Sequence, residues 1–230
     1  MLKKYLYTGG LALFIIITLL LFNILGIFTD QGFVTEQLEK NNATERISNA
    51  KEIDQNVRTY LTEPTKELNQ TKLTQREILH LEDVKNLYTV GNILVALFFF
   101  LIALGLFYHL MPKLWEFGLV LLGFVALIVG LGAIAQWQFD SLFTLFHKIV
   151  FTNDLWLLSA EHTLIKLYPQ EFFLNSFLKA LDRTFIITLA LSLIFLATGL
   201  FRLKKRPNEE NKSEKPEKKR KSKKKKKKSS

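Results

Sequence analysis

Four histidines are the side chains of this sequence best suited to acid–base chemistry: His80, His109, His147 and His162. Because an imidazole titrates near neutral pH, it can take up a proton and return it within one reaction. The chain has no cysteine, which excludes a thiol nucleophile, thiolate metal sites and disulfides. It also has no Gly-x-Ser-x-Gly elbow, no His-Glu-x-x-His motif and no glycine-rich phosphate loop. Histidine-mediated proton transfer therefore remains as the candidate chemistry.

Two of these histidines have a carboxylate close by in sequence. Asp83 follows His80 by three residues, so the two share one face of a helix. Asp154 follows His147 by seven residues. A histidine near a membrane interface can equally be a packing or hydrogen-bonding residue, and that reading applies best to His109, beside Met111-Pro112-Lys113.

Four apolar stretches indicate how these residues are positioned. They cover roughly Gly9–Phe28, Tyr88–Tyr108, Leu114–Ala135 and Thr184–Phe201. About 20 apolar residues are needed to cross the hydrocarbon core as a helix, and lipid offers no partner for an unpaired backbone N–H or C=O. The sequence therefore predicts an all-α integral membrane protein with four transmembrane helices, multi-pass in the plasma membrane.

The positive charges predict the orientation of these spans. Lys3 and Lys4 precede the first span, Lys113 lies in the short link between the second and third, and basic residues follow the fourth. The positive-inside rule places all these charges in the cytoplasm. Both termini are then inside, and the loops at about 29–87 and 136–183 face outward. His80 and His147 consequently lie on the same extracytoplasmic side.

The basic character of the chain comes from its C-terminal tail. Residues 202–230 hold 16 Lys/Arg and 4 Asp/Glu, a charge of +12, so the other 201 residues sum to −2 within the total of +10. A lysine-rich run cannot bury apolar surface and repels itself. We predict a four-span membrane domain over 1–203 and a disordered polybasic tail over 204–230. The tail favours anionic inner-leaflet lipid, and it lacks the interleaved aromatic residues typical of nucleic-acid binding.

The two outer loops have different compositions. The first is polar with apolar residues at helical spacing, which predicts amphipathic helices up to a break at Pro64. Thr74-Gln75-Arg76-Glu77 is a capping box that predicts one long helix from about Gln75 to Tyr108. The second loop is rich in Phe and Trp, as in segments lying at the membrane interface. There, Asn153 or Asp154 could cap a helix that continues to Tyr168 and stops at Pro169.

Three short motifs in these outer segments occur in a fixed order. They are Glu77-x-x-His80-Leu81-x-Asp83-Val84-Lys85, Phe146-His147-x-x-x-Phe151-x-Asn153-Asp154-x-Trp156, and Pro169-x-x-Phe172-Phe173. Together with the four-span layout, they resemble the lipoprotein intramolecular transacylase (Lit) family of Firmicute membranes. The resemblance covers most of residues 1–201 and leaves out the lysine tail.

This resemblance implies an activity. Lit enzymes move the sn-2 acyl chain of a lipoprotein S-diacylglyceryl cysteine to the α-amine of that cysteine, which yields the lyso form. It implies that His80 and His147 are the catalytic pair, without a cofactor or metal. We expect Asp83 or Asp154 to orient a histidine and Lys85 or a backbone N–H to stabilise the oxyanion, with Trp156 as a further supporting residue.

Two other functions are compatible with the residues alone. His80, His147 and His162, with Asp83 or Asp154, could bind zinc or copper in an extracytoplasmic metal-binding or sensing protein, although their spacing matches no metal motif. The chain could also be a structural membrane partner that uses its first outer loop for docking and its tail as a tether.

Overall fold

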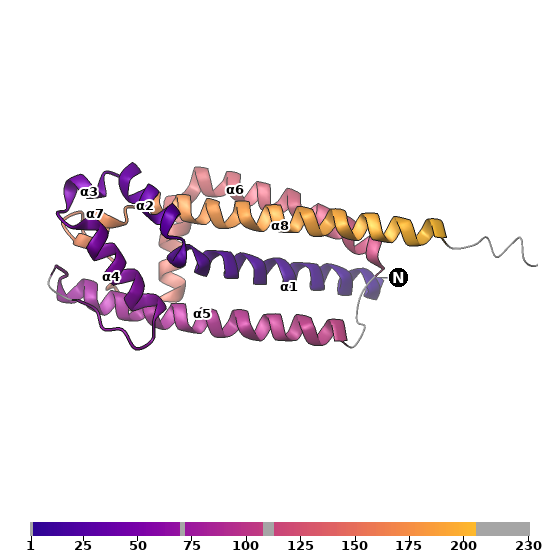
Figure 1. Ribbon diagram of the computed structural model, residues 1–230, viewed down its shortest axis with the longest axis horizontal. Coiled ribbons are helices and arrows are strands. Elements are labelled where there is room, and N and C mark those ends of the chain that lie inside the picture. Colours follow the sequence, from indigo (N-terminus) through magenta and orange to yellow (C-terminus); the bar gives the residue numbers. More distant parts are fainter. Residues whose placement is uncertain (1, 70–71, 108–112, 206–230) are drawn as a thin grey trace, which may run out of the picture.

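The computed structural model describes residues 2–69, 72–107 and 113–205. Within these ranges all regular structure is helical. The four long helices are α1 (Leu2–Gly26), α5 (Gln75–Phe107), α6 (Leu114–Val150) and α8 (Gln170–Lys205). The short ones are η1 (Ile27–Thr29), α2 (Gln31–Lys40), α3 (Ala43–Arg46), α4 (Ala50–Thr62) and α7 (Thr163–Leu167). Figure 1 shows the long helices side by side and the short ones gathered at one end.

Four helices of the described ranges are long and apolar enough to cross a membrane, so the predicted all-α architecture with four spans is confirmed. They extend well past the apolar stretches. α5 has 33 residues, about 50 Å at 1.5 Å per residue, against a hydrocarbon core of about 30 Å. One end of such a helix must project from the bilayer. α8 includes the first two residues of the predicted tail, 204 and 205, whereas His109 and residues 206–230 lie outside the described residues.

The projecting ends join the short helices in a cap, which we define as the described parts of residues 30–87 and 139–169. Leu81 of α5 packs with Val57, Leu61 and Leu164 in one apolar cluster of this cap. The Lys85 ammonium donates to the carbonyls of two residues in the loop after α4. The first three turns of α5 are therefore fixed by the cap and lie outside the apolar bundle.

The second outer loop begins with a continuation of α6. This helix runs past the apolar stretch that ends at Ala135, as far as Val150, with a kink at Gln138, whose φ of −123° and ψ of 23° are not helical. The helix expected from Asn153 to Tyr168 is wrong, because only Thr163–Leu167 is helical there. The Asn153 side chain instead accepts from the Leu155 backbone N–H at 3.0 Å, a local turn that competes with a helix.

α1 lies between α5 and the α6–α8 pair (Figure 1). Towards α8, the Asn23 amide donates to the Thr184 hydroxyl at 3.0 Å. Towards α5, the Phe14 and Phe98 rings lie 4.9 Å apart. These contacts set the positions of α5 and α8 against α1, and α6 packs along α8. His80 lies on α5 and His147 on α6.

Gly118 of α6 and Gly199 of α8 let these two helices approach each other closely. A Cβ built on Gly199 would lie 2.5 Å from the Trp115 backbone nitrogen, whereas a Cβ on Gly123 of α6 would meet nothing within 4 Å. We therefore expect Gly199→Ala to destabilise the bundle by about 1–3 kcal/mol through overpacking. Gly123→Ala should be neutral or slightly stabilising because alanine favours a helix. Thermal unfolding midpoints in one detergent would check this, and equal midpoints would contradict it.

Candidate functional site

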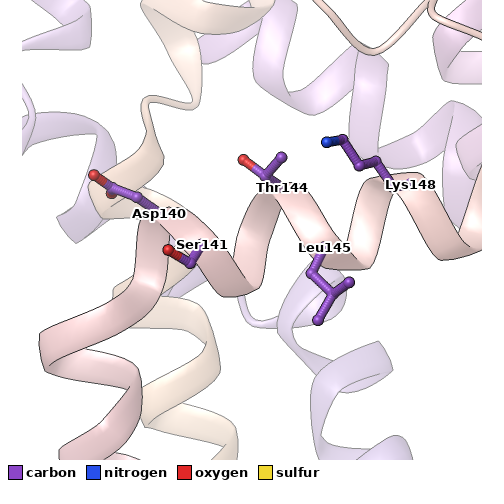
Figure 2. A pocket seen from close by; sticks show the side chains of 5 residues that line it. All are labelled: Asp140, Ser141, Thr144, Leu145 and Lys148. Atoms are coloured by element: carbon purple, nitrogen blue, oxygen red, sulfur yellow. The ribbon is translucent and has the colours of Figure 1, made fainter.

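The kink in α6 directs its second segment away from the axis of the first. Figure 2 shows this corner at Asp140, with Ser141 to Lys148 along the new direction. The Asp140 carboxylate accepts a hydrogen bond from the Gln170 side chain, which fixes the corner against the start of α8. One face of the segment carries a shallow hollow lined by Asp140, Ser141, Thr144, Leu145 and Lys148. His147 does not line it.

His147 lies on another face of this segment, inside an aromatic cluster. The residue is only 8% exposed. Its ring centroid lies 4.2 Å from that of Phe143, 5.5 Å from Phe151 and 5.0 Å from Trp156. The cluster excludes most water from one side of the imidazole. Trp156, expected as a supporting residue, thus contacts His147 directly.

His80 reaches the same place from α5. The ring centroids of His80 and His147 are 6.3 Å apart, although 67 residues separate them in sequence. Phe151 contacts both rings, with its centroid 5.3 Å from that of His80. The structure therefore brings together the two histidines that the motifs singled out. One small reacting group can touch both imidazoles.

The proton on His147 can be placed from its hydrogen bond. Its Nδ1 lies 2.7 Å from the Phe143 backbone carbonyl oxygen. A carbonyl oxygen only accepts, so Nδ1 carries the hydrogen and Nε2 of the neutral ring keeps a lone pair. The Nδ1 of His80 is buried and has no hydrogen-bond partner among the described residues. Both rings thus have hydrogen-bonding capacity left for a ligand.

Burial keeps both histidines neutral at physiological pH. The pKa of His80 is lowered to about 4, mainly by burial and also by the neighbouring His147, while the Asp83 carboxylate partly opposes the shift. Burial also lowers the pKa of His147, partly offset by its hydrogen bond to the Phe143 carbonyl. A neutral imidazole is the form that accepts a proton.

Asp83 acts on His80 through its charge, since its own hydrogen bond goes elsewhere. Its Oδ2 accepts from the Asn153 side-chain amide at 2.9 Å. This bond joins α5 to the stretch that follows α6, directly beside the two rings. Sequence reasoning did not select Asn153 as a site residue, because its partner is 70 residues away and no local pattern indicates that contact.

Lys85 does not serve the site as the sequence suggested. Its Nζ donates to the carbonyls of Pro64 and Lys66, both at 3.2 Å, and lies 4.1 Å from the Tyr60 ring centroid. Five residues correspond to about 140° around a helix from His80. The ammonium therefore holds the loop after α4 in place, and another donor is needed for an oxyanion.

Asp154 is likewise attached to the cap through its backbone. The Arg76 guanidinium donates to its carbonyl oxygen, while no contact joins its carboxylate to either histidine among the described hydrogen bonds and ion pairs. Asp154 therefore helps to fix the stretch after α6. The orienting role expected of its carboxylate has no geometric support.

Glu77 sets the position of His80 one turn away. The expected capping box is present, since the Glu77 carboxylate accepts from the Thr74 N–H at 2.7 Å and from its hydroxyl at 2.8 Å. Its other oxygen accepts from the Leu164 N–H at 2.8 Å, and the residue is fully buried. Glu77 thus stabilises the first turn of α5 and connects that helix to α7.

His162 does not join the pair. Its Nδ1 lies 3.0 Å from the Ser159 backbone nitrogen and 2.9 Å from the Ser159 hydroxyl, in a local turn before α7. Among the described residues, no three His, Asp or Glu side chains are grouped to hold a metal ion. The alternative metal site of His80, His147 and His162 is therefore not assembled.

Residues 10–173 match the family model described as lipoprotein intramolecular transacylase Lit. This chain belongs to the Lit family. It is therefore a lipoprotein intramolecular transacylase and a multi-pass membrane protein, as the motifs indicated. None of the curated proteins matches the chain in sequence.

Solved structures of a Lit enzyme share the fold. The membrane integral lipoprotein intramolecular transacylase Lit from Bacillus cereus superposes with a TM-score of 0.67 at 19% identity, covering 88% of this chain and 97% of that one. Two variants of the same enzyme, with a histidine replaced by arginine or by alanine, superpose with a TM-score of 0.64 at 19% identity. They cover 88% of this chain and 93% and 94% of theirs.

Proposed function

We propose that this Lit-family protein moves the sn-2 acyl chain of an S-diacylglyceryl cysteine to the α-amine of the same cysteine, at the extracytoplasmic face of the plasma membrane. The observation that carries the proposal is the pairing of His80 and His147, with ring centroids 6.3 Å apart, beside aromatic rings that leave His147 only 8% exposed. The substrates are diacylated lipoproteins, and the product is the lyso form.

His147 acts as the proton carrier in this proposal. Its Nε2 is the free acceptor, because Nδ1 is bonded to the Phe143 carbonyl. The α-amine attacks the ester carbonyl carbon and passes a proton to Nε2. The C–O bond to glycerol then breaks, and the same proton goes to the leaving glycerol oxygen. An amide replaces an ester, and no water or other reactant is consumed.

His80 supplies the second interaction. A neutral imidazole has one N–H to donate, and a donor aimed at the ester carbonyl oxygen stabilises the negative charge that develops there. Asp83, held by Asn153 at 2.9 Å, favours positive charge at this ring. His80 is therefore the oxyanion donor in this proposal. Lys85 cannot take that role, because its side chain points to a different face of α5.

The surroundings favour acyl transfer over hydrolysis. Amine and ester belong to one molecule, and holding them in attack geometry can supply about 7–11 kcal/mol of the barrier reduction. The rings of Phe143, Phe151 and Trp156 keep water away from His147. A water molecule therefore competes poorly with the α-amine.

The orientation is part of the proposal and rests on the distribution of charge. With both termini in the cytoplasm, the cap lies outside, and the tail rests on anionic inner-leaflet lipid. A reporter fused after Arg206 should behave as cytoplasmic, and one inserted beside Asn69 as external. The inverted pattern would place the histidine pair in the cytoplasm and contradict the proposed site.

The pKa shifts of the two histidines predict how the rate of acyl transfer depends on pH. The substrate amine has a pKa near 8, so the logarithm of the rate should rise with a slope of about one between pH 6.5 and 7.5 as the amine loses its proton. Because burial lowers the pKa of both histidines from the ordinary imidazole value, both are mainly neutral over this range and add little further slope. Single-turnover rates would check this. A slope near two in this range would show that a histidine titrates as well.

The function itself can be tested in cells that express or lack the protein. Intramolecular transfer gives an isomer, so the intact mass of the N-terminal lipopeptide does not change. The α-amine, however, should stop reacting with amine reagents, and tandem mass spectrometry should find an acyl group on the cysteine nitrogen. A free α-amine in expressing cells would contradict the proposed function.

A further inference from the structure

A row of apolar side chains on α5 begins two turns after His80, on the side towards the membrane. Its residues follow one another at steps of three and four, which keeps them on the helix face that also carries His80 and Asp83. We call this row the leucine stripe: Leu87, Val90, Leu94, Leu97 and Leu101. Four of its members are exposed, Val90 by 53%, Leu94 by 38%, Leu97 by 46% and Leu101 by 43%.

No other long helix covers the stripe. α5 packs on α1 through a different face, where Val95 is buried and Gly91 meets Leu25. The other two long helices pack on each other and on α1, and Figure 1 shows α5 on the far side of α1 from them. Within the described residues, the stripe therefore faces the space that hydrocarbon fills in a bilayer.

The geometry points to an occupant for this surface: the acyl chain that is transferred. This inference rests on the proposed function. The reacting ester carbon must lie between His80 and His147, and the chain attached to that carbon must leave the site in an apolar direction. The stripe is continuous with the His80 face and carries no polar side chain. The sn-2 chain then runs down α5 towards the middle of the membrane.

Because the stripe is long, chains of different length contact different numbers of its residues, so the rate of transfer depends on the length of the acyl chain. Fourteen residues separate His80 from Leu94, about 21 Å along the helix. A short chain ends before Leu94, whereas a long chain lies against it. Changes at Leu94 should therefore affect long chains selectively.

The same helix offers a matched control. Ile93 is 62% exposed and one residue before Leu94, so it sits at nearly the same depth. It is turned by about 100° around the helix axis, which takes it off the stripe. A bulky side chain at Ile93 meets bulk lipid and not the bound chain.

The experiment uses two synthetic S-diacylglyceryl-cysteine lipopeptides that compete in liposomes, with decanoyl or octadecanoyl at sn-2 and the same sn-1 chain. We expect Leu94→Trp to lower the octadecanoyl-to-decanoyl ratio of kcat/KM about tenfold, while Ile93→Trp keeps the ratio of the unmodified protein. An active Leu94→Trp enzyme with an unchanged ratio, or an equal fall in both variants, would overturn the inference.

A second measurement needs no substitution. An octadecanoyl lipopeptide with a diazirine in its sn-2 chain is photolysed with the unmodified protein, and crosslinks are mapped by mass spectrometry. Crosslinks at stripe residues support the inference, and crosslinks confined to the Ile93 side or to other helices overturn it. Turnover of the unmodified substrate by the unmodified protein tests the proposed function separately.

Discussion

Replacing His147 by alanine is expected to reduce acyl transfer by about 10²–10⁴-fold, because the variant loses the base that takes the amine proton. His80→Ala should reduce it by about 10²–10³-fold through loss of the oxyanion donor. The double variant should be little slower than the slower single one, since residues that act on one reacting group are not additive. Rates of product formation on a synthetic lipopeptide would measure all three.

His162→Ala is the matched control for this series. His162 lies in the same cap, and the described hydrogen bonds of its ring go to Ser159 in its own turn. The His162→Ala variant should keep most of the acyl-transfer activity. All variants must insert into the membrane to the same level, as judged by extraction and size exclusion. An inserted His80→Ala or His147→Ala protein with near-normal rates would refute the proposed roles.

Asp54→Ala is expected to cost about 3–5 kcal/mol in stability of the cap, because it leaves a buried cation without its partner. Asp54 is 2% exposed, and its carboxylate lies 2.8 Å from the Arg58 guanidinium. It also accepts from the Tyr168 hydroxyl at 2.8 Å. Burial and the Asp54 charge raise the pKa of Tyr168 well above its usual value, so this hydroxyl stays a donor. The network links α4 to the segment before α8.

Amide hydrogen exchange in α4 would measure this cost directly, as a faster opening of the helix. Glu39→Ala is the control, since its ion pair with Lys51 at 2.8 Å has side chains 56% and 59% exposed. An exposed pair of this kind contributes about 0.2–1 kcal/mol. Equal exchange in the two variants would show that the buried network does not hold the cap together.

Much of the fold follows from the sequence because its signals are local. The four spans follow from apolar length, and the long α5 follows from the capping box at Thr74 and Glu77 with no stop signal after it. The meeting of His80 and His147 was predicted from their shared side of the membrane and from the Lit motifs, and the structure places their rings together.

Other features depend on contacts that no local pattern shows. The α6 kink at Gln138 has neither proline nor glycine at its corner, and Asp140 is held there by Gln170 from another helix. The irregular stretch after Val150 follows from side chains such as Asn153, whose bonds to Leu155 and Asp83 replace those of a helix. Lys85, expected as one of two alternative oxyanion donors, lies five residues after His80, and a five-residue step turns a side chain about 140° around the helix.

The central claim is that the acyl group moves within one lipoprotein molecule at the His80–His147 pair. The most direct test is a crossover experiment with purified protein in liposomes. Two lipopeptides of different peptide sequence are mixed, and only one carries a deuterated sn-2 chain. Tandem mass spectrometry should find the deuterated chain amide-linked to its own peptide alone, with the intact mass unchanged. Deuterated chains on the other peptide, or released as free fatty acid, would contradict this account.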